Sequence, residues 1–370
     1  MEKCVNSAGY LRGNFQKESL VAKFAIDKIK IEAIYSCVPS QKIKTSEYSL
    51  FSNYECLLFE KTTGIKERRV ASKDLTCSDL CFKAAESLLT DLKIDREEID
   101  VLIFVSQSPD YFLPATAIIL QEKLGLAKNC MAFDINLGCS GYVYGLSVLS
   151  SLLKSGLKKG LLLAGDKSTI STSFNDKSTY PLFGDAGSAT LLSFDKISEP
   201  MFFDLHSDGS GKDAIIIEYG HSRFPYNTFN DEEREYEPGI KRSRNHLALD
   251  GMKVFNFALK EVAKSIDECL QFAKNEKESV DFFVLHQANK LINDSVRKKM
   301  KLAEDKFPMS IDNFGNTSSA SIPLTICTSL KNQIENKELT LLLSGFGVGL
   351  SWANVLLKMG PIPVKCIDYD

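Results

Sequence analysis

Residues 131–156 read MAFDINLGCSGYVYGLSVLSSLLKSG and decide the fold. The first seven residues are mostly apolar and have the length of a strand, and the remainder has the length of a helix that stops near Gly156. A strand followed at once by an amphipathic helix is the building unit of an α/β fold. Four apolar residues in the helical part recur on one stripe: Val143, Leu146, Leu149 and Leu153.

Other strand-length apolar runs alternate with helix-length segments along the chain. They are almost continuously apolar, which is typical of strands in sheets that are covered on both faces. The sequence therefore predicts an α/β protein with buried sheets. The runs are Asp100–Ser106 (DVLIFVS), Gly160–Gly165 (GLLLAG), Asp281–Leu285 (DFFVL) and Leu339–Ser344 (LTLLLS).

Several of these landmarks repeat at a fixed offset of 180 residues, without a gap. This period is far longer than that of solenoid repeats, so we interpret it as a duplicated α/β unit. The matching positions are Ser106-Gln107 with His286-Gln287, Asn136 with Asn316, Cys139 with Ser319, and GLLLAG at 160 with TLLLSG at 340.

The repeat suggests a division of the 370 residues, which exceed what one core usually serves. We expect an N-terminal extension over 1–24, a first half over 25–200 and a second half over 201–370. A polar, charge-dense insertion occupies about 207–250. It is either a functional lid or a solvated surface loop without a role.

Composition excludes several classes of protein. The net charge of −3 leaves no basic excess for nucleic acid or an anionic membrane. The ten cysteines include no CxxC pair, so no metal site is indicated. The first residues lack the apolar core of a secretory leader, and no run of about 18 residues is apolar throughout. We therefore expect a reducing, cytoplasmic location without a membrane partner.

Cys139 lies where the predicted strand turns into the helix. Helix N-termini lower thiol pKa values and thereby favour the nucleophilic thiolate. The alternative is a buried structural cysteine, but Gly138 and Gly141 allow a sharp turn and a close approach of substrate.

His286 ends a strand and opens a polar run, VLHQANK, although a strand-end histidine can also be a satisfied core residue. Asn316 lies in the loop DNFGNTSSAS, which could be a simple turn or helix cap. The repeat predicts that both meet Cys139 at one site. The other three histidines, His206, His221 and His246, are expected to be solvated.

The segment SGFGVGLSW, Ser344–Trp352, follows a strand and precedes another strand-like run. A phosphate-binding loop would instead have to open a helix. We therefore interpret it as a turn whose backbone N–H groups face a developing oxyanion.

These motifs resemble those of a known family. GCSG around Cys139, HQAN at 286–289, GNTSSAS at 315–321 and GFGVGLSW at 345–352 resemble the Cys-His-Asn condensing enzymes of the thiolase superfamily, most closely the β-ketoacyl-ACP synthase III type. The resemblance extends from about residue 25 to 358. It implies a duplicated thiolase-like fold with five layers, α-β-α-β-α, and a homodimer.

The resemblance also implies roles. Cys139 accepts an acyl group from an acyl-CoA or acyl-ACP thioester. His286 and Asn316 hold the thioester carbonyl of malonyl-ACP during decarboxylation, and the N–H groups of Cys139 and Val348 bind the oxyanion. The product is a 3-oxoacyl-ACP, no cofactor is required, and the acyl pocket involves Leu113, Phe346 and Gly347.

Three positions depart from the family pattern. Leu58 and Thr62 replace the Trp and Arg that contact the coenzyme A nucleotide, which favours an acyl-ACP donor or another pose of CoA. Leu113 stands where the family commonly has Phe, in a loop that reaches the partner's pocket. Leu291 replaces an arginine that docks the carrier protein, so Lys290, Arg297 and Lys298 would take that role unless they form only a solvated face.

Alternatives remain open from sequence alone. The same site could transfer an acyl group to a hydroxyl or amine acceptor without decarboxylation. The chain could also be a non-catalytic scaffold or carrier-protein binder. A 3-hydroxy-3-methylglutaryl-type or olefin-type member would need a carboxylate base, for which only Asp110 lies nearby in sequence.

Overall fold

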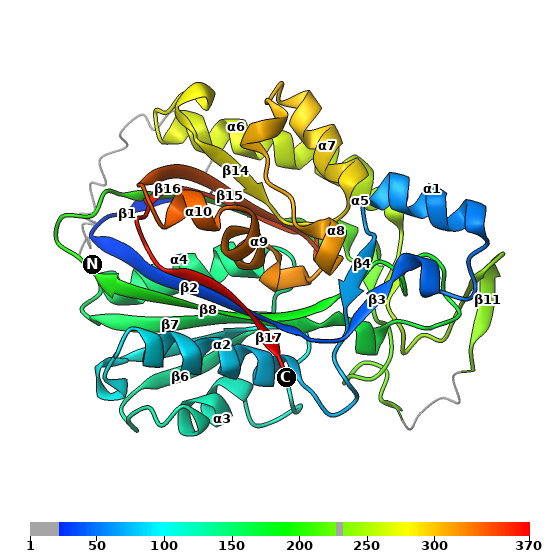
Figure 1. Cartoon of the computed structure of the whole chain (residues 1–370), viewed down its shortest axis with the longest axis horizontal. Coiled ribbons are helices and arrows are strands. Elements are labelled where there is room, and N and C mark those ends of the chain that lie inside the picture. Colours follow the sequence, from blue (N-terminus) through cyan, green and yellow to red (C-terminus); the bar gives the residue numbers. More distant parts are fainter. Residues whose placement is uncertain (1–21, 227–231) are drawn as a thin grey trace, which may run out of the picture.

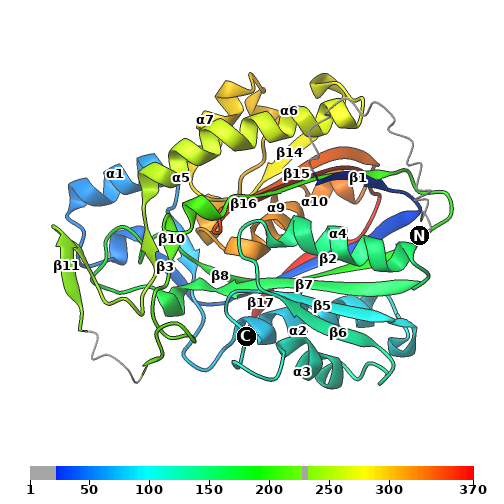
Figure 2. The same cartoon turned by 180° about the vertical axis from the view of Figure 1, so that it is seen from behind.

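The computed structural model describes residues 22–226 and 232–370. Two mixed sheets lie one above the other, with helices between them and on both outer faces (Figures 1 and 2). The first sheet has the order β17 (Val364–Tyr369), β2 (Ile29–Pro39), β8 (Asp185–Phe194), β7 (Lys159–Lys167), β5 (Val101–Val105), β6 (Met131–Ile135). The second has the order β1 (Ala22–Ile26), β9 (Met201–Ser207), β16 (Ser351–Met359), β15 (Leu339–Gly347), β14 (Phe282–Leu285).

The helices form three layers around these sheets, so the predicted five-layered α-β-α-β-α fold is confirmed (Figure 1). The central layer contains α4 (Gly141–Lys154) and α9 (Ser321–Ser329). Outside the first sheet lie α2 (Cys77–Asp91) and α3 (Thr116–Lys123), and outside the second lie α5 (Gly251–Phe257), α6 (Ala263–Phe272) and α7 (Lys290–Lys299). Shorter elements near the edges are β3 (Lys42–Lys44), α1 (Asn53–Thr63), β4 (Glu67–Arg69), α8 (Ile311–Phe314) and α10 (Lys331–Ile334).

The duplication predicted from the 180-residue offset is confirmed. The order β2-β8-β7-β5 in one sheet repeats as β9-β16-β15-β14 in the other. In both sets the last pair is parallel and the other two pairs are antiparallel. The chain ends exchange sheets, because β1 joins the second sheet and β17 joins the first. The division at residues 24 and 200 therefore stays a prediction, and residues 1–21 lie outside the described part.

The predicted apolar stripe of α4 is buried between the two sheets. Its four residues, Val143, Leu146, Leu149 and Leu153, are fully inaccessible to solvent. Burying each such side chain contributes about 1.5–3 kcal/mol. All five residues of β5 are buried as well, which confirms that this sheet is covered on both faces. The central layer thus fixes the position of the residues at the N-terminus of α4.

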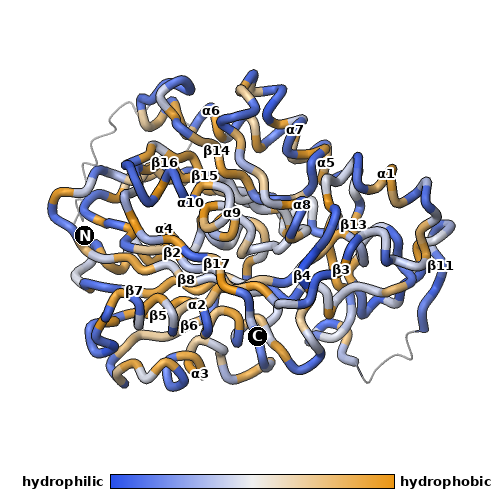
Figure 3. Tube along the Cα trace, in the orientation of Figure 1, coloured by the Kyte–Doolittle hydropathy of each residue, from blue (hydrophilic) through white to orange (hydrophobic). Residues whose placement is uncertain are grey.

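The predicted insertion is built from two small antiparallel pairs. Strand β10 (Ile215–Ile216) pairs with β13 (Ala248–Leu249), and β11 (Arg234–Glu237) pairs with β12 (Ile240–Arg242). In Figure 3 the outer strand β11 is hydrophilic, in contrast to the apolar strands of the two sheets. Residues 227–231, which we also expect to belong to the insertion, lie outside the described residues.

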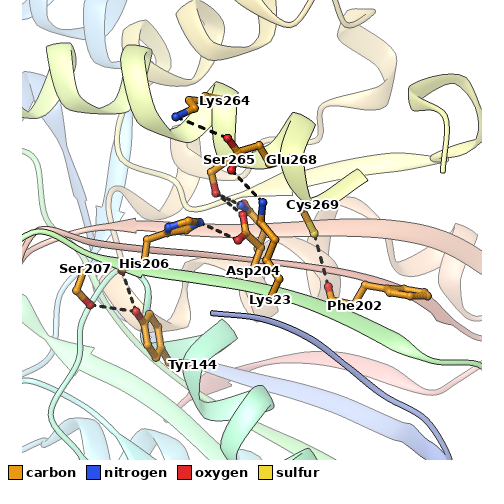
Figure 4. Close-up of polar contacts among 11 residues, drawn as sticks. Lys23, Tyr144, Phe202, Asp204, His206, Ser207, Lys264, Ser265, Glu268 and Cys269 are labelled. Atoms are coloured by element: carbon orange, nitrogen blue, oxygen red, sulfur yellow. Dashed lines mark hydrogen bonds and ion pairs between the residues drawn. The ribbon is translucent and has the colours of Figure 1, made fainter. Parts of the chain in front are cut away.

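A polar cluster ties α6 to the second sheet (Figure 4). The buried Asp204 carboxylate accepts a hydrogen bond from Ser265 Oγ at 2.9 Å and lies 2.8 Å from His206 Nε2. Glu268 pairs with Lys23 at 3.0 Å and with Lys264 at 3.6 Å. Because Glu268 pairs with both lysines, and Asp204 is held by Ser265 and His206, we interpret this cluster as structural.

Two of the three histidines that we expected to be solvated are partly buried, so that expectation was wrong for them. The His206 ring stacks on Trp352 with centroids 4.9 Å apart. His246 Nδ1 lies 3.0 Å from Ser243 Oγ. His221 is exposed as expected, with its ring 5.5 Å from that of Phe112. Within the described ranges, no helix combines the length and the apolar character that crossing a membrane requires.

Candidate active site

The ends of strands in both halves bring three distant side chains to one cavity. Cys139 lies between β6 and α4, His286 follows β14, and Asn316 lies between α8 and α9. All three line a cavity of about 380 Å³. Its wall also contains Phe346 and Gly347 from the end of β15 and Val348 from the turn that follows. The arrangement agrees with the convergence that the repeat predicts.

Cys139 is more deeply buried than the sequence suggested, and the expected lowering of its pKa is wrong. Burial raises the pKa of the thiol to about 11. The Val348 N–H group and the Ser318 hydroxyl, 4.0 Å from the sulfur, oppose this effect only in part. The helix itself starts later, at Gly141. Cys139 is therefore a protonated thiol at neutral pH.

His286 is also held in its neutral form. Its side chain is almost completely buried, and burial lowers its pKa to about 3. Nδ1 lies 2.7 Å from Ser321 Oγ, and the ring meets Phe346 edge-on with centroids 5.6 Å apart. These contacts fix the plane of the imidazole beside the cavity. At rest the site consequently holds a thiol and an imidazole rather than an ion pair.

Asn316 is positioned by contacts with both halves. Its backbone N–H donates to Leu182 O at 3.0 Å, and its carbonyl accepts from the Gly184 N–H at 3.1 Å. The side-chain Oδ1 accepts from the Ser318 N–H at 3.0 Å. Nδ2 donates to Ala288 O over a longer 3.4 Å. The carboxamide is thus oriented with donor capacity left for a ligand.

The C-terminal end of β15 approaches the sulfur because it contains glycines. A Cβ at Gly347 would lie 2.8 Å from Cys139 Sγ, and one at Gly345 would lie 2.8 Å from the Cys139 carbonyl oxygen. Either side chain would force this strand end away from the cysteine. The absence of side chains at 345 and 347 lets the Val348 N–H point at the sulfur.

Asp166, which we did not predict as a site residue, links the two halves through hydrogen bonds next to the site. One carboxylate oxygen accepts from the Gln107 N–H at 2.7 Å and from Ser106 Oγ at 3.2 Å. The other accepts from the N–H and the hydroxyl of Ser319 at 3.1 and 2.7 Å. Burial raises the pKa of Asp166, and these donors oppose it. Its signal in the sequence is an acid directly after the apolar run GLLLAG.

Some of the other predicted site residues line the cavity and the rest lie outside it. Phe346 and Gly347 line the cavity, but Leu113 is 73% exposed and does not line the cavity of its own chain. Lys290 begins α7 beside the cavity and pairs with Asp294 at 2.7 Å. At the far end of the same helix are Arg297, which also contacts Asp294, and the exposed Lys298.

Leu58 and Thr62, the two departures from the family's coenzyme A contacts, are both exposed on α1.

Sequence reasoning also missed several cavity-lining residues. A polar set follows strands of the first half, and an apolar set comes from the insertion. They are Gln107, Asn136, Ser168, Ser171, Ile215, Ile216, Ile217, Leu247 and Leu249.

Comparison with known proteins places this arrangement in a family. Residues 133–209 match the family described as 3-oxoacyl-[acyl-carrier-protein (ACP)] synthase III, and residues 270–359 match its C-terminal part. A Campylobacter jejuni protein named putative 3-oxoacyl-[acyl-carrier-protein] synthase 3 is 38% identical, covering 93% of this chain and 98% of the relative. A Streptococcus agalactiae β-ketoacyl-[acyl-carrier-protein] synthase III is 35% identical, with coverages of 89% and 99%.

Solved structures agree with the sequence relatives. The crystal structure of a 3-oxoacyl-(acyl-carrier protein) synthase from Burkholderia xenovorans superimposes with a TM-score of 0.89 at 38% identity. It covers 94% of this chain and 99% of the other. With matching sequence, fold and strand-end cavity, the chain belongs to the 3-oxoacyl-ACP synthase III family of thiolase-fold enzymes.

Proposed function

We propose that this enzyme condenses an acyl thioester with malonyl-ACP, with loss of CO₂, to give a 3-oxoacyl-ACP. The observation that carries the proposal is the meeting of Cys139, His286 and Asn316 in one cavity, with the Val348 N–H directed at the sulfur. The names of the relatives support the same reaction for those proteins.

The first step loads Cys139. The thiol attacks the carbonyl carbon of the donor thioester, the new C–S bond forms, and the old C–S bond breaks. The thiol proton passes to the departing thiolate of the donor. Neutral His286 lines the same cavity and can accept and return this proton, although burial and the resulting low pKa make it a weak base. The N–H groups of Val348 and Cys139 stabilise the tetrahedral oxyanion, and such donors typically contribute about 10²–10³ in rate.

The second step uses two residues of the second half. His286 and Asn316 donate hydrogen bonds to the thioester oxygen of the malonyl group, so that the enolate formed on loss of CO₂ is stabilised as it develops. Its carbon attacks the acyl carbonyl on Cys139, and the C–S bond to the enzyme breaks. The Cys139 thiolate that is released takes up one proton from solvent and becomes the thiol again. No cofactor enters this scheme.

The partners form part of the proposal. An acyl carrier protein would dock where α7 begins, with Lys290 nearest to the cavity and Arg297 and Lys298 further along the helix. A homodimer is supported by the edge strand β6, which has one neighbour among the described strands, and by the exposed loop Tyr111–Leu113. In such a dimer Leu113 would reach the partner's pocket.

A cytoplasmic location, with neither nucleic acid nor membrane as partner, belongs to the same proposal. All nine cysteines in the described ranges are free, which fits a reducing compartment. The acyl-carrier substrates of the relatives point the same way.

The test is mass spectrometry of the intact protein after incubation with an acyl-ACP, followed by addition of malonyl-ACP. We expect one acyl group on the wild type and on Cys56→Ala, and none on Cys139→Ala. Cys56 is a matched control because it is partly exposed and does not line the cavity. A product that keeps two malonyl carbons, with one CO₂ per turnover, supports condensation. Acyl transfer to a hydroxyl or amine without CO₂ would contradict it.

A further inference from the structure

One side of the cavity carries polar side chains that have no partner in the described part of the chain. They come from the ends of three adjacent strands of the first sheet. Gln107 follows β5, Asn136 follows β6, and Ser168 and Ser171 follow β7. All four line the cavity, and none of their side chains forms a hydrogen bond within the described residues; Ser168 and Ser171 are partly buried, whereas Gln107 and Asn136 reach solvent at the cavity's open side. Two amides and two hydroxyls therefore face the same space.

Gln107 packs against the residue that precedes the nucleophile. A Cβ on Gly138, the residue before Cys139, would lie 2.4 Å from Gln107 Oε1, so the amide occupies the space that a side chain at 138 would fill. The backbone of Gln107 is fixed by the 2.7 Å hydrogen bond to Asp166. The amide is thus placed beside the acyl-bearing cysteine on a rigid strand end.

An acyl chain on Cys139 shares its cavity with these polar side chains. When an acyl group is attached to Cys139, its carbonyl oxygen points at the Val348 N–H. The attacking carbon arrives from the side of His286 and Asn316. The Gln107 amide, which packs against Gly138 in the same cavity, lies within reach of an acyl chain that extends away from these groups.

The same region has an apolar wall and no unpaired charge. Leu182, Phe183 and Leu247 line the cavity together with the polar set. The Asp166 carboxylate already accepts four hydrogen bonds from the protein. Lys167 Nζ donates to the carbonyls of Ser72 and Lys73 at 2.8 and 3.1 Å. The described walls thus suit a neutral group with both apolar and hydrogen-bonding character.

We propose that the acyl group loaded on Cys139 is a short, neutral hydroxyacyl chain rather than a plain alkyl chain. A hydroxyl can donate to and accept from the amides and serines, whereas an alkyl chain would strip water from them without replacing its hydrogen bonds. The inference rests on the proposed function, because it concerns the group that the same cysteine carries.

The experiment compares two thioesters of equal chain length. Wild-type protein is incubated with equal concentrations of 3-hydroxybutyryl- and butyryl-N-acetylcysteamine, and the two acyl-enzymes are quantified by intact-protein mass spectrometry. We expect about tenfold more hydroxybutyryl loading. Gln107→Met, which keeps the length of the side chain but removes its amide, should reduce this ratio toward one. Gln41→Met is the matched control, because Gln41 is exposed and does not line the cavity.

The outcomes separate this inference from the proposed function. If butyryl loads on Cys139 as well as or better than hydroxybutyryl, the hydroxyacyl proposal is overturned while the acyl-enzyme stands. A preference that Gln107→Met leaves intact would also overturn the assignment of the polar wall. If neither thioester loads Cys139, and acyl-ACP fails too, the proposed function itself is wrong.

Discussion

The pH dependence of Cys139 alkylation follows directly from its buried position. Only the thiolate reacts, and a pKa of about 11 leaves a fraction of about 3 in 10⁴ ionised at pH 7.5. Between pH 7.5 and 9.5 that fraction rises about 100-fold. An ordinary thiol with a pKa of about 8.5 gains only about tenfold over the same range. The two cases are therefore distinguishable without leaving the pH range of a folded protein.

The assay measures the rate of iodoacetamide addition to Cys139 by peptide mass spectrometry at half-unit intervals from pH 6 to 9.5. We expect a logarithmic slope near one throughout, because neither the thiol nor the neutral His286 changes its dominant state in this window. A free cysteine in the same solution supplies the reference, which bends near its own pKa. A plateau for Cys139 below pH 9, or a fast rate independent of pH, would show a thiolate–imidazolium pair and refute the reasoning.

Three further perturbations test neighbouring residues. Because His286 is buried in its neutral form, its contribution to the free energy of unfolding should be fully present above pH 6.5. This contribution should be lost as the pH falls toward 3, by at most about 1.4 kcal/mol per pH unit. His286→Asn should flatten this pH dependence in urea denaturation, whereas His221→Asn should not. Asp166→Asn should cost about 1–3 kcal/mol, measured as a lower thermal midpoint, while the exposed Asp213→Asn should change it little; equal midpoints for the two would contradict the bridging role. Gly347→Ala should slow acylation more than 10²-fold, whereas Gly209→Ala, with open space around it, should leave the rate unchanged.

Much of the fold follows from sequence periodicity because its strands and central helices bury long apolar runs. The 180-residue offset holds at β7 and β15 and at α4 and α9, because both halves use the same strand–helix geometry. It also predicts that side chains at strand ends meet. The cavity that Cys139, His286 and Asn316 share is the consequence of that symmetry.

Other features depend on three-dimensional surroundings that local sequence does not specify. The Cys139 thiol pKa is raised because the second half covers it, and a helix N-terminus alone gives the opposite expectation. Asp166 can be recognised as a residue that links the two halves only once the hydrogen bonds that it accepts from Ser319 are known. Leu247 and Leu249 line the cavity although the surrounding segment is charge-dense, because the insertion folds its apolar residues inward.

The most direct measurement of the shared site is single-turnover discharge of the acyl-enzyme. Wild type, His286→Ala and Asn316→Ala are each loaded with acyl-ACP, freed of excess donor and mixed with malonyl-ACP. We predict that the wild type releases one CO₂ and loses its acyl group in step, while both variants become acylated on Cys139 but retain the acyl group. Variants that discharge as fast as the wild type would contradict the account.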